Sequence, residues 1–310
     1  MSRLYSLEPI GIGTPDTESL SSYLTRLAQE HCVVSKKMIM GEIAPAILGK
    51  HYQLEMLLKN VSSIFGNSDA KPAINGMREK TRSLVKALEQ LTLRQDLRYL
   101  SCLTYQGVIK DRSLFRQHKA WCPQCFQQQK LEKRVIYEPL LWSFKDVNYC
   151  LQHNRQLSDR CPHCDSTQKA IANNSRIGFC DRCQQWLGSD LINEVEIVEK
   201  ELQIITVIGE LIATAPILNS PPTLPDMIQK LKLIQYSFER SLFQDLTQFI
   251  ALGKILEQLK IAILQNSDKP IDLVRLLIPV CNLANISIAQ IFHEDISGIS
   301  QILNINFNRS

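Results

Sequence analysis

Cys122-Pro-Gln-Cys125 opens a stretch of the chain in which the same spacing returns three times, as Cys150-Leu-Gln-His153, Cys161-Pro-His-Cys164 and Cys180-Asp-Arg-Cys183. In each pair two residues separate the ligands, a spacing that lets two soft side chains on one tight turn take adjacent corners of a tetrahedron. One such pair arises by chance fairly often, but four pairs within residues 122–183 do not. The pattern therefore predicts zinc binding.

The number of ligands predicts two closed sites. A structural zinc ion takes four protein ligands, whereas a catalytic one keeps a position open for water, so eight ligands fill two structural sites. The simplest division gives a site of three cysteines and one histidine, Cys122, Cys125, Cys150 and His153, and an all-cysteine site, Cys161, Cys164, Cys180 and Cys183. A cross-braced division, in which the first pair joins the third, stays open from the sequence.

A disulfide framework is the alternative explanation for so many cysteines. It requires an oxidising compartment, but Met1-Ser2-Arg3-Leu4-Tyr5 leads into no apolar signal segment. Cys32, Cys102 and Cys281 stand outside the pairs, and we expect them to be small buried hydrophobic residues. We therefore expect reduced thiols in an intracellular protein.

Charge is distributed unevenly along the chain. Residues 110–190 carry 13 Lys and Arg against 8 Asp and Glu, whereas residues 191–310 carry 9 against 13. The basic zinc region favours an acidic partner, most commonly nucleic acid, although so small an excess also fits a solvated surface. The candidate contacts to nucleic acid or a partner are Lys119, Lys133, Arg134, Arg155, Arg160, Arg176 and Arg182. No apolar run approaches the roughly 18–20 residues that cross a membrane.

The length of 310 residues allows two or three domains. We expect a mainly α fold with small β elements of zinc-ribbon type. Three parts are predicted: an N-terminal helix-turn-helix-like domain over residues 1–117, a tandem zinc-binding module over 118–190, and a C-terminal helical domain over 191–310. Three prolines disfavour a helix near residues 219–225 and indicate a linker there.

Apolar periodicity predicts the positions of the helices. The first has Asp16 or Thr17 as its expected N-cap and a buried face that begins at Leu20. The polar residues expected off that face are Ser21, Thr25, Arg26 and Gln29. Further helices are expected near 37–40, 53–58, 78–91 and 195–214, as two within 228–264, and as two within 271–291 with Ser287 as a cap. The likeliest extended stretch by composition is 134–144, which is rich in β-branched and aromatic residues.

Aromatic residues gather around the cysteine pairs. They are Trp121, Tyr137, Trp142, Phe144 and Trp186, interleaved with several of the basic candidates. Such residues can stack on bases of nucleic acid. They can equally fill the small cores around bound metal ions, and we favour this second role.

Catalytic motifs are absent from the sequence. Gly41 and Gly49-Lys50 suggest a phosphate-binding loop, but their spacing is too long and His51 stands where Ser or Thr is needed. There is no Gly-x-Ser-x-Gly elbow and no His-Glu-x-x-His helix. His31, His118 and His163 have no general-base partner nearby in the sequence, and we expect His163 to lie beside a metal site or in solvent. We expect no enzyme activity.

Two parts of the sequence resemble the TniQ family, the target-selection factors of Tn7-like transposons. The first part is Glu18-Ser19-Leu20-x-Ser22-Tyr23-Leu24-x-Arg26-Leu27-Ala28. The second is Cys122-Pro-x-Cys125 followed by Tyr137, Trp142, Cys150-x-x-His153, Leu157 and Cys161-Pro-x-Cys164. The similarity covers about residues 5 to 190. Many relatives carry a basic residue shortly before the tryptophan that corresponds to Trp142, but this chain has Leu140 and Leu141 there. No basic contact to nucleic acid is therefore expected at this position.

The resemblance implies a non-catalytic adaptor of the bacterial cytoplasm, associated with the nucleoid when engaged on DNA. Such proteins bridge a target-recognition element to the AAA+ ATPase TnsC, which recruits the transposase. The chain is similar in length to the shorter relatives, which implies that it links a CRISPR effector complex with guide RNA, at target DNA, to a TnsC-like ATPase. The alternative is an autonomous DNA-binding target selector of the TnsD type. A zinc-dependent enzyme would need a site with one non-protein ligand. The sequence does not decide which type of CRISPR effector is the partner, or whether the chain forms a homodimer.

Overall fold

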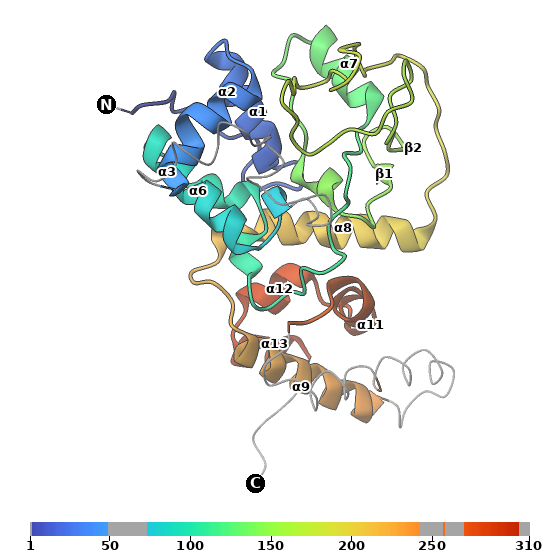
Figure 1. Ribbon diagram of the computed structural model, residues 1–310. Helices are drawn as coiled ribbons and strands as arrows, with labels where there is room; N and C mark the ends of the chain where they lie inside the picture. Colours follow the sequence, from blue (N-terminus) through green and yellow to red (C-terminus); the bar gives the residue numbers. More distant parts are fainter. Residues whose placement is uncertain (1, 49–72, 242–256, 258–269, 304–310) are drawn as a thin grey trace.

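The computed structural model describes residues 2–48, 73–241, 257 and 270–303. Within these residues the fold is mainly helical, as the sequence predicts. Figure 1 shows the N-terminal helices beside the cysteine-rich region, with the long helix α8 (Glu199–Thr214) running beneath the latter and the C-terminal helices below α8. No described helix is long and apolar enough to cross a lipid bilayer.

The N-terminal part is a cluster of helices around α1 (Leu20–Glu30). The chain continues through α2 (Ser35–Met38), the π-helical turn η1 (Ile39–Ile43), α3 (Ala44–Leu48), the 3-10 turn η3 (Ala73–Asn75), α6 (Glu79–Thr92) and the 3-10 turns η4 (Leu97–Leu100) and η5 (Leu103–Tyr105). Helices expected near 37–40 and 78–91 are confirmed by α2 with η1 and by α6. The helix expected near 53–58 lies outside the described residues, and the helix-turn-helix-like geometry stays a prediction.

One expectation about α1, the identity of its N-cap, was wrong. The N-cap is Ser19, whose side chain accepts a hydrogen bond from the Ser22 amide at 3.2 Å, and neither Asp16 nor Thr17. Four polar residues were expected off the apolar face. Of these, Ser21, Thr25 and Arg26 are buried, and Gln29 is exposed. The helix is covered on more than its apolar face, because other segments supply hydrogen-bond partners to its polar side chains.

The cysteine-rich region contains little regular structure. Its elements are α7 (Pro123–Leu131), the 3-10 turn η6 (Leu140–Ser143) and the two short strands β1 (Tyr149–Cys150) and β2 (Arg155–Gln156). The strands pair antiparallel, with Tyr149 opposite Gln156. The expected strand over residues 134–144 is absent: the described chain there forms η6 and two isolated bridges, at Pro139 and Phe144. Each bridge pairs with a distant segment, so no ladder extends along this stretch.

The C-terminal part consists of further helices. After α8 come the 3-10 turn η7 (Ala215–Ile217), α9 (Leu224–Ser241), the π-helical turn η8 (Leu273–Leu277), α11 (Ile278–Ala284), α12 (Ile288–His293) and α13 (Ile296–Ile302). The helix break expected near residues 219–225 is confirmed up to Thr223, after which Pro225 lies in the first turn of α9, where proline is tolerated. Ser287 caps α12 in a capping box with Gln290, as expected. The second helix expected within 228–264 lies almost wholly outside the described residues.

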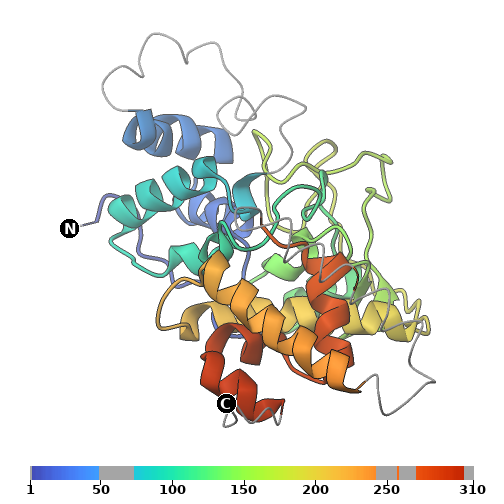
Figure 2. The same cartoon turned by 90° about the horizontal axis from the view of Figure 1, so that it is seen from below.

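Two apolar cores hold the described structure together. One lies among the N-terminal helices and includes Leu24 and Leu88. The other runs from the cysteine-rich region into the C-terminal helices. There α11 and α12 pack on α8, and α9 contacts α11 and α12 in turn (Figure 2). The Tyr105 hydroxyl donates to the Leu211 carbonyl of α8 at 2.6 Å, and Lys110 donates to the Ile271 carbonyl at 2.8 Å. The predicted domain boundaries stay a prediction.

Candidate metal centres

The first cluster brings together Cys122, Cys125, Cys150 and His153. Their ligand atoms all lie within 4.8 Å of one another. The His153 Nδ1 atom lies 3.2 Å from the Cys125 Sγ and 3.6 Å from the sulfurs of Cys122 and Cys150. The three cysteines are buried and the histidine is partly exposed.

Local structure explains the geometry of this cluster. Cys122 is the N-cap of α7, and Pro123 occupies the first helical position, where its missing N–H and fixed φ cost nothing. The Cys122–Cys125 pair is therefore one turn at a helix start. The second pair lies at the end of β1 and in the turn to β2, where Asn154 adopts a φ of 43°. Asparagine tolerates this left-handed conformation better than most residues, and the turn aims Cys150 and His153 at the helix start.

The second cluster brings together Cys161, Cys164, Cys180 and Cys183, from two turns with the same backbone pattern. Asp165 and Gln184, which follow the second cysteine of each pair, have positive φ values of 53° and 57°. In both turns the first cysteine's carbonyl accepts from that residue, at 2.9 and 3.0 Å. Backbone amides of His163 and Arg182 lie 3.4 Å from the sulfurs of Cys161 and Cys180. Such N–H donors stabilise thiolates, the form in which cysteine binds a metal.

Both clusters fit a tetrahedral zinc ion. With Zn–S bonds of about 2.3 Å, two sulfurs at neighbouring corners are roughly 3.8 Å apart. The Cys161–Cys183 and Cys164–Cys180 sulfur pairs are each 3.7 Å apart, and the Cys125 and Cys150 sulfurs are 3.5 Å apart. The structure therefore brings the ligands together in the sequential division, and the cross-braced one is wrong.

The chemistry of the donor set also calls for a cation. The Cys122 side chain and burial together raise the pKa of the Cys150 thiol to about 12. Several thiolates packed this closely repel one another unless a positive ion lies between them. Bound zinc would supply a cross-link between segments. With four protein ligands in each cluster, no position is left for a substrate.

Trp186 joins the second cluster to the first. Its indole Nε1 donates to the Gln127 side chain of α7 at 2.9 Å, and its ring lies 5.1 Å from Phe179. Lys130 of α7 lies over the same ring at 4.7 Å. The two clusters are therefore held in a fixed relation by packing around one aromatic side chain.

The aromatic residues fill a core, as expected, but this core is larger than one around the metal ligands alone. Trp121, Trp142 and Phe144 are buried in the core shared with the C-terminal helices, and Tyr137 and Trp186 are partly buried. Of the cysteines outside the clusters, Cys102 and Cys281 are buried as expected, but Cys32 is exposed. It follows α1 in a turn with a φ of 55°, which brings it out of the core. His163 is exposed beside the second cluster, and its Nε2 lies 3.1 Å from the Trp186 carbonyl oxygen.

The seven basic candidates divide by exposure. Arg155 is buried, and its guanidinium donates to the Leu191 carbonyl at 3.1 Å. Lys119 is mostly buried and forms an ion pair with Glu138 at 2.8 Å. The other five are exposed: Lys133, Arg134, Arg160, Arg176 and Arg182. Arg134 and Arg160 pair with Glu132 and Asp165, whereas the remaining three form no ion pair among the described residues.

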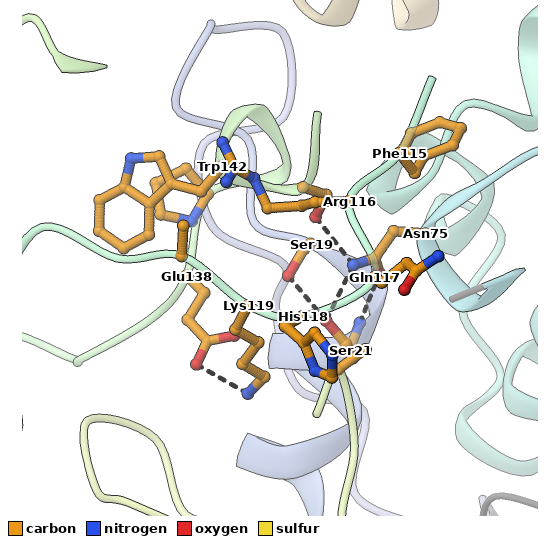
Figure 3. Close-up of a pocket in the computed structure, with 14 residues that line it drawn as sticks. Ser19, Ser21, Asn75, Phe115, Arg116, Gln117, His118, Lys119, Glu138 and Trp142 are labelled. Carbon is orange, nitrogen blue, oxygen red and sulfur yellow. Dashed lines mark hydrogen bonds and ion pairs between the residues drawn. The ribbon is translucent and has the colours of Figure 1, made fainter. Parts of the chain in front are cut away.

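A polar junction connects α1 to the cysteine-rich region (Figure 3). The Asn75 side-chain amide donates to the hydroxyls of Ser21 at 3.0 Å and Ser143 at 2.9 Å, and its oxygen accepts from the Ser21 amide. These bonds surround a small cavity of about 30 Å³, lined also by Arg116, enough for one or two water molecules. The junction ties three distant segments together.

A buried ion pair beside this junction was not anticipated from the sequence. The Glu18 carboxylate is fully buried and accepts from Arg26 at 2.7 and 3.1 Å and from the Ser22 hydroxyl at 2.9 Å. These are residues of the first motif quoted above, so that motif is explained as a folding element. Helical periodicity places Arg26 off the apolar face. The one sequence signal for its partner is the acidic residue Glu18, eight positions earlier.

These observations define a class of protein: a mainly helical fold whose centre is built around two closed clusters of zinc-type ligands. The family model for TniQ matches residues 9–157. The match includes the Glu18–Arg26 pair and the whole first cluster, and it ends before the second. Residues 9–157 therefore form a TniQ domain, which marks a protein associated with target selection in transposition. A comparison with curated proteins gave no match.

Proposed function

We propose that this chain is a transposition targeting adaptor, which links a CRISPR effector complex with guide RNA, bound at target DNA, to a TnsC-like AAA+ ATPase. The observation that carries the proposal is the TniQ domain over residues 9–157, since this family acts in target selection without catalysis of its own. The ATPase then recruits the transposase.

Two structural zinc ions are part of the proposal. Cys122, Cys125, Cys150 and His153 would hold the first, and Cys161, Cys164, Cys180 and Cys183 the second. The region between residues 118 and 190 has short strands and little regular structure, so metal cross-links would join segments that no helix or sheet ladder connects. Their role would be to fix the surface that partners contact.

The exposed basic residues of the cysteine-rich region support a contact to DNA or RNA phosphates. Lys133, Arg176 and Arg182 form no ion pair among the described residues, so their charge is available to a partner. Arg176 also packs its guanidinium 4.0 Å from the Phe179 ring, which holds it in place. We do not extend this contact to Lys119 and Arg155, which bond within the fold.

The same basic surface favours the second candidate, an autonomous target selector of the TnsD type that reads DNA directly. Against it stands the acidic balance of residues 191–310, where 9 basic residues face 13 acidic ones. Phosphate contacts that position a protein on DNA come mainly from Lys and Arg, and a net negative C-terminal part weakens such binding.

The experiment compares binding of the purified chain to a generic DNA duplex, to the ATPase of the same transposon and to its guide-RNA effector complex, near physiological salt. The proposal predicts binding to the ATPase and the effector, with weak DNA binding that falls steeply as salt increases. Tight, sequence-dependent DNA binding by the chain alone would establish the second candidate instead. Failure to bind either protein would contradict the adaptor role.

A further inference from the structure

Five large apolar side chains are exposed within a short stretch of sequence that runs from the end of the second cluster into the first turn of α8. Leu191 and Ile192 are 71% and 72% exposed, Val198 is 65% exposed, and Val195 and Leu202 are also exposed. We refer to these five residues as the apolar strip. Tyr5, Leu93 and Ile217 are exposed apolar residues elsewhere in the sequence. A surface on which several large apolar residues gather marks an interaction site.

The strip lies on an outer segment of the molecule. Figure 1 shows the chain descending along the outer side of the cysteine-rich region to the start of α8. Residues 187–198 contain no helix or strand. The TniQ match ends at residue 157, so this segment lies outside the matched domain.

The backbone of this segment has unused hydrogen-bonding groups. The Val195 amide donates to the Asn154 carbonyl at 2.6 Å, and the Leu191 carbonyl accepts from Arg155 at 3.1 Å. Among the described residues, the amides of Ile192, Asn193, Glu194, Glu196 and Ile197 have no acceptor. The two anchored residues hold the chain in place while these amides remain available. A segment with free amides can pair with an extended segment of another chain.

Charge identifies the kind of partner. Between residues 190 and 202 the acidic residues are Asp190, Glu194, Glu196, Glu199 and Glu201, and Lys200 is the one base. Glu194, Glu196 and Glu199 are exposed beside the strip. This potential repels nucleic acid and attracts a basic polypeptide.

We propose that residues 190–202 form a docking edge for an extended, basic segment of a partner protein, in which Lys or Arg alternates with apolar side chains. Alternate free amides of this stretch, such as those of Glu194 and Glu196 on either side of Val195, would pair with that segment. The apolar strip would contact its apolar side chains, and the glutamates would pair with its cations. This inference goes beyond the proposed function, because it requires a protein partner of this chemistry and no particular effector.

The test uses the full chain and a labelled peptide in which Lys alternates with Val and Ile, followed by fluorescence anisotropy and amide hydrogen exchange. The control peptide has Glu in place of each Lys. The proposal predicts binding of the basic peptide alone, with slower exchange of the free amides of Glu194 and Glu196. Equal binding of both peptides, or unchanged exchange at these amides, would overturn it.

Variants separate the three contributions. Ile192→Ser with Val198→Ser should weaken binding on the order of tenfold or more, because each removes apolar contact area. Glu196→Pro removes an amide that has no acceptor among the described residues, so it should weaken binding further than Glu196→Gln does. Ile217→Ser, at a side chain 58% exposed elsewhere, is the matched control and should bind like the parent chain.

Two further outcomes would also overturn the proposal. If the chain self-associates and the strip variants abolish that association, the occupant is a second copy. If the strip variants weaken duplex binding and leave peptide binding intact, the surface serves DNA.

Discussion

Replacing Arg26 by methionine tests how the TniQ domain is held together. The substitution keeps much of the side-chain volume but removes two hydrogen bonds to the Glu18 carboxylate, at 2.7 and 3.1 Å, and one to the Glu8 carbonyl at 2.8 Å. Glu18 would keep the Ser22 hydroxyl and a weak bond from the Ile10 amide at 3.4 Å. A fully buried carboxylate would then lack a compensating charge.

Breaking a buried ion pair by removing one partner costs about 3–5 kcal/mol. Arg26 and Glu18 are 11% and 0% exposed, so little of this cost is relieved by solvent. At roughly 2–4 °C per kcal/mol for a chain of this size, the midpoint of thermal unfolding should fall by about 10 °C. Circular dichroism would measure the shift, and hydrogen exchange of α1 would locate it.

The pH dependence gives an independent check. Burial raises the pKa of the Glu18 carboxyl, and Arg26 opposes that effect. Without Arg26 this pKa rises further, so the folded variant binds a proton that the unfolded chain has released. Its stability should therefore fall as pH rises through the folded-state pKa, and its deficit relative to the parent should be smaller at pH 5 than at pH 8.

A double variant supplies the control. Glu18→Gln with Arg26→Met removes both charges, and it should cost less than the sum of the two single substitutions because no unpaired ion remains. Additive costs, or an Arg26→Met variant as stable as the parent, would refute the ion-pair reasoning.

Three other substitutions test the remaining parts of the structure. Cys180→Ser should lower the zinc content from two ions per chain to one, as measured by atomic emission, and should abolish targeted integration. An unchanged content of two ions would exclude Cys180 as a ligand. Gly178→Ala places a Cβ in steric conflict with the Trp186 ring, at a residue whose φ is 77°. It should therefore disrupt the packing between the clusters, seen as a change in tryptophan fluorescence, and an unchanged spectrum and thermal midpoint would contradict this. Ser287→Ala removes a cap and should destabilise the C-terminal helices by about 1 kcal/mol in denaturant unfolding, whereas Ser287→Asp, which preserves a capping oxygen, should cost less.

The metal clusters could be predicted from the sequence because their signal is local. Each Cys-x-x-Cys or Cys-x-x-His turn is defined by four residues, and the count of eight ligands fixes two closed sites. The cap at Ser287 was likewise predictable, because a capping box needs only Ser and Gln three residues apart. Which pair joins which depends on the path of the chain between them, and the structure was needed to decide it.

Features that depend on distant segments were missed. Asn75 joins Ser21 to Ser143, residues 54 and 68 positions away in sequence, and no local pattern announces such a bond. The strand expected over residues 134–144 had suitable composition, but a strand also needs a neighbour to pair with, and only single bridges form there. The burial of Arg26 depends in the same way on Glu18.

The most direct test of the adaptor role is a recruitment measurement on DNA. The guide-RNA effector complex would be assembled on a duplex that carries its target, and retention of the labelled ATPase would be measured with and without this chain. The account predicts retention only when the effector and this chain are both present, and loss of retention when zinc is chelated. Retention by this chain without the effector, on one particular DNA sequence, would contradict the account and show that the chain selects its target directly.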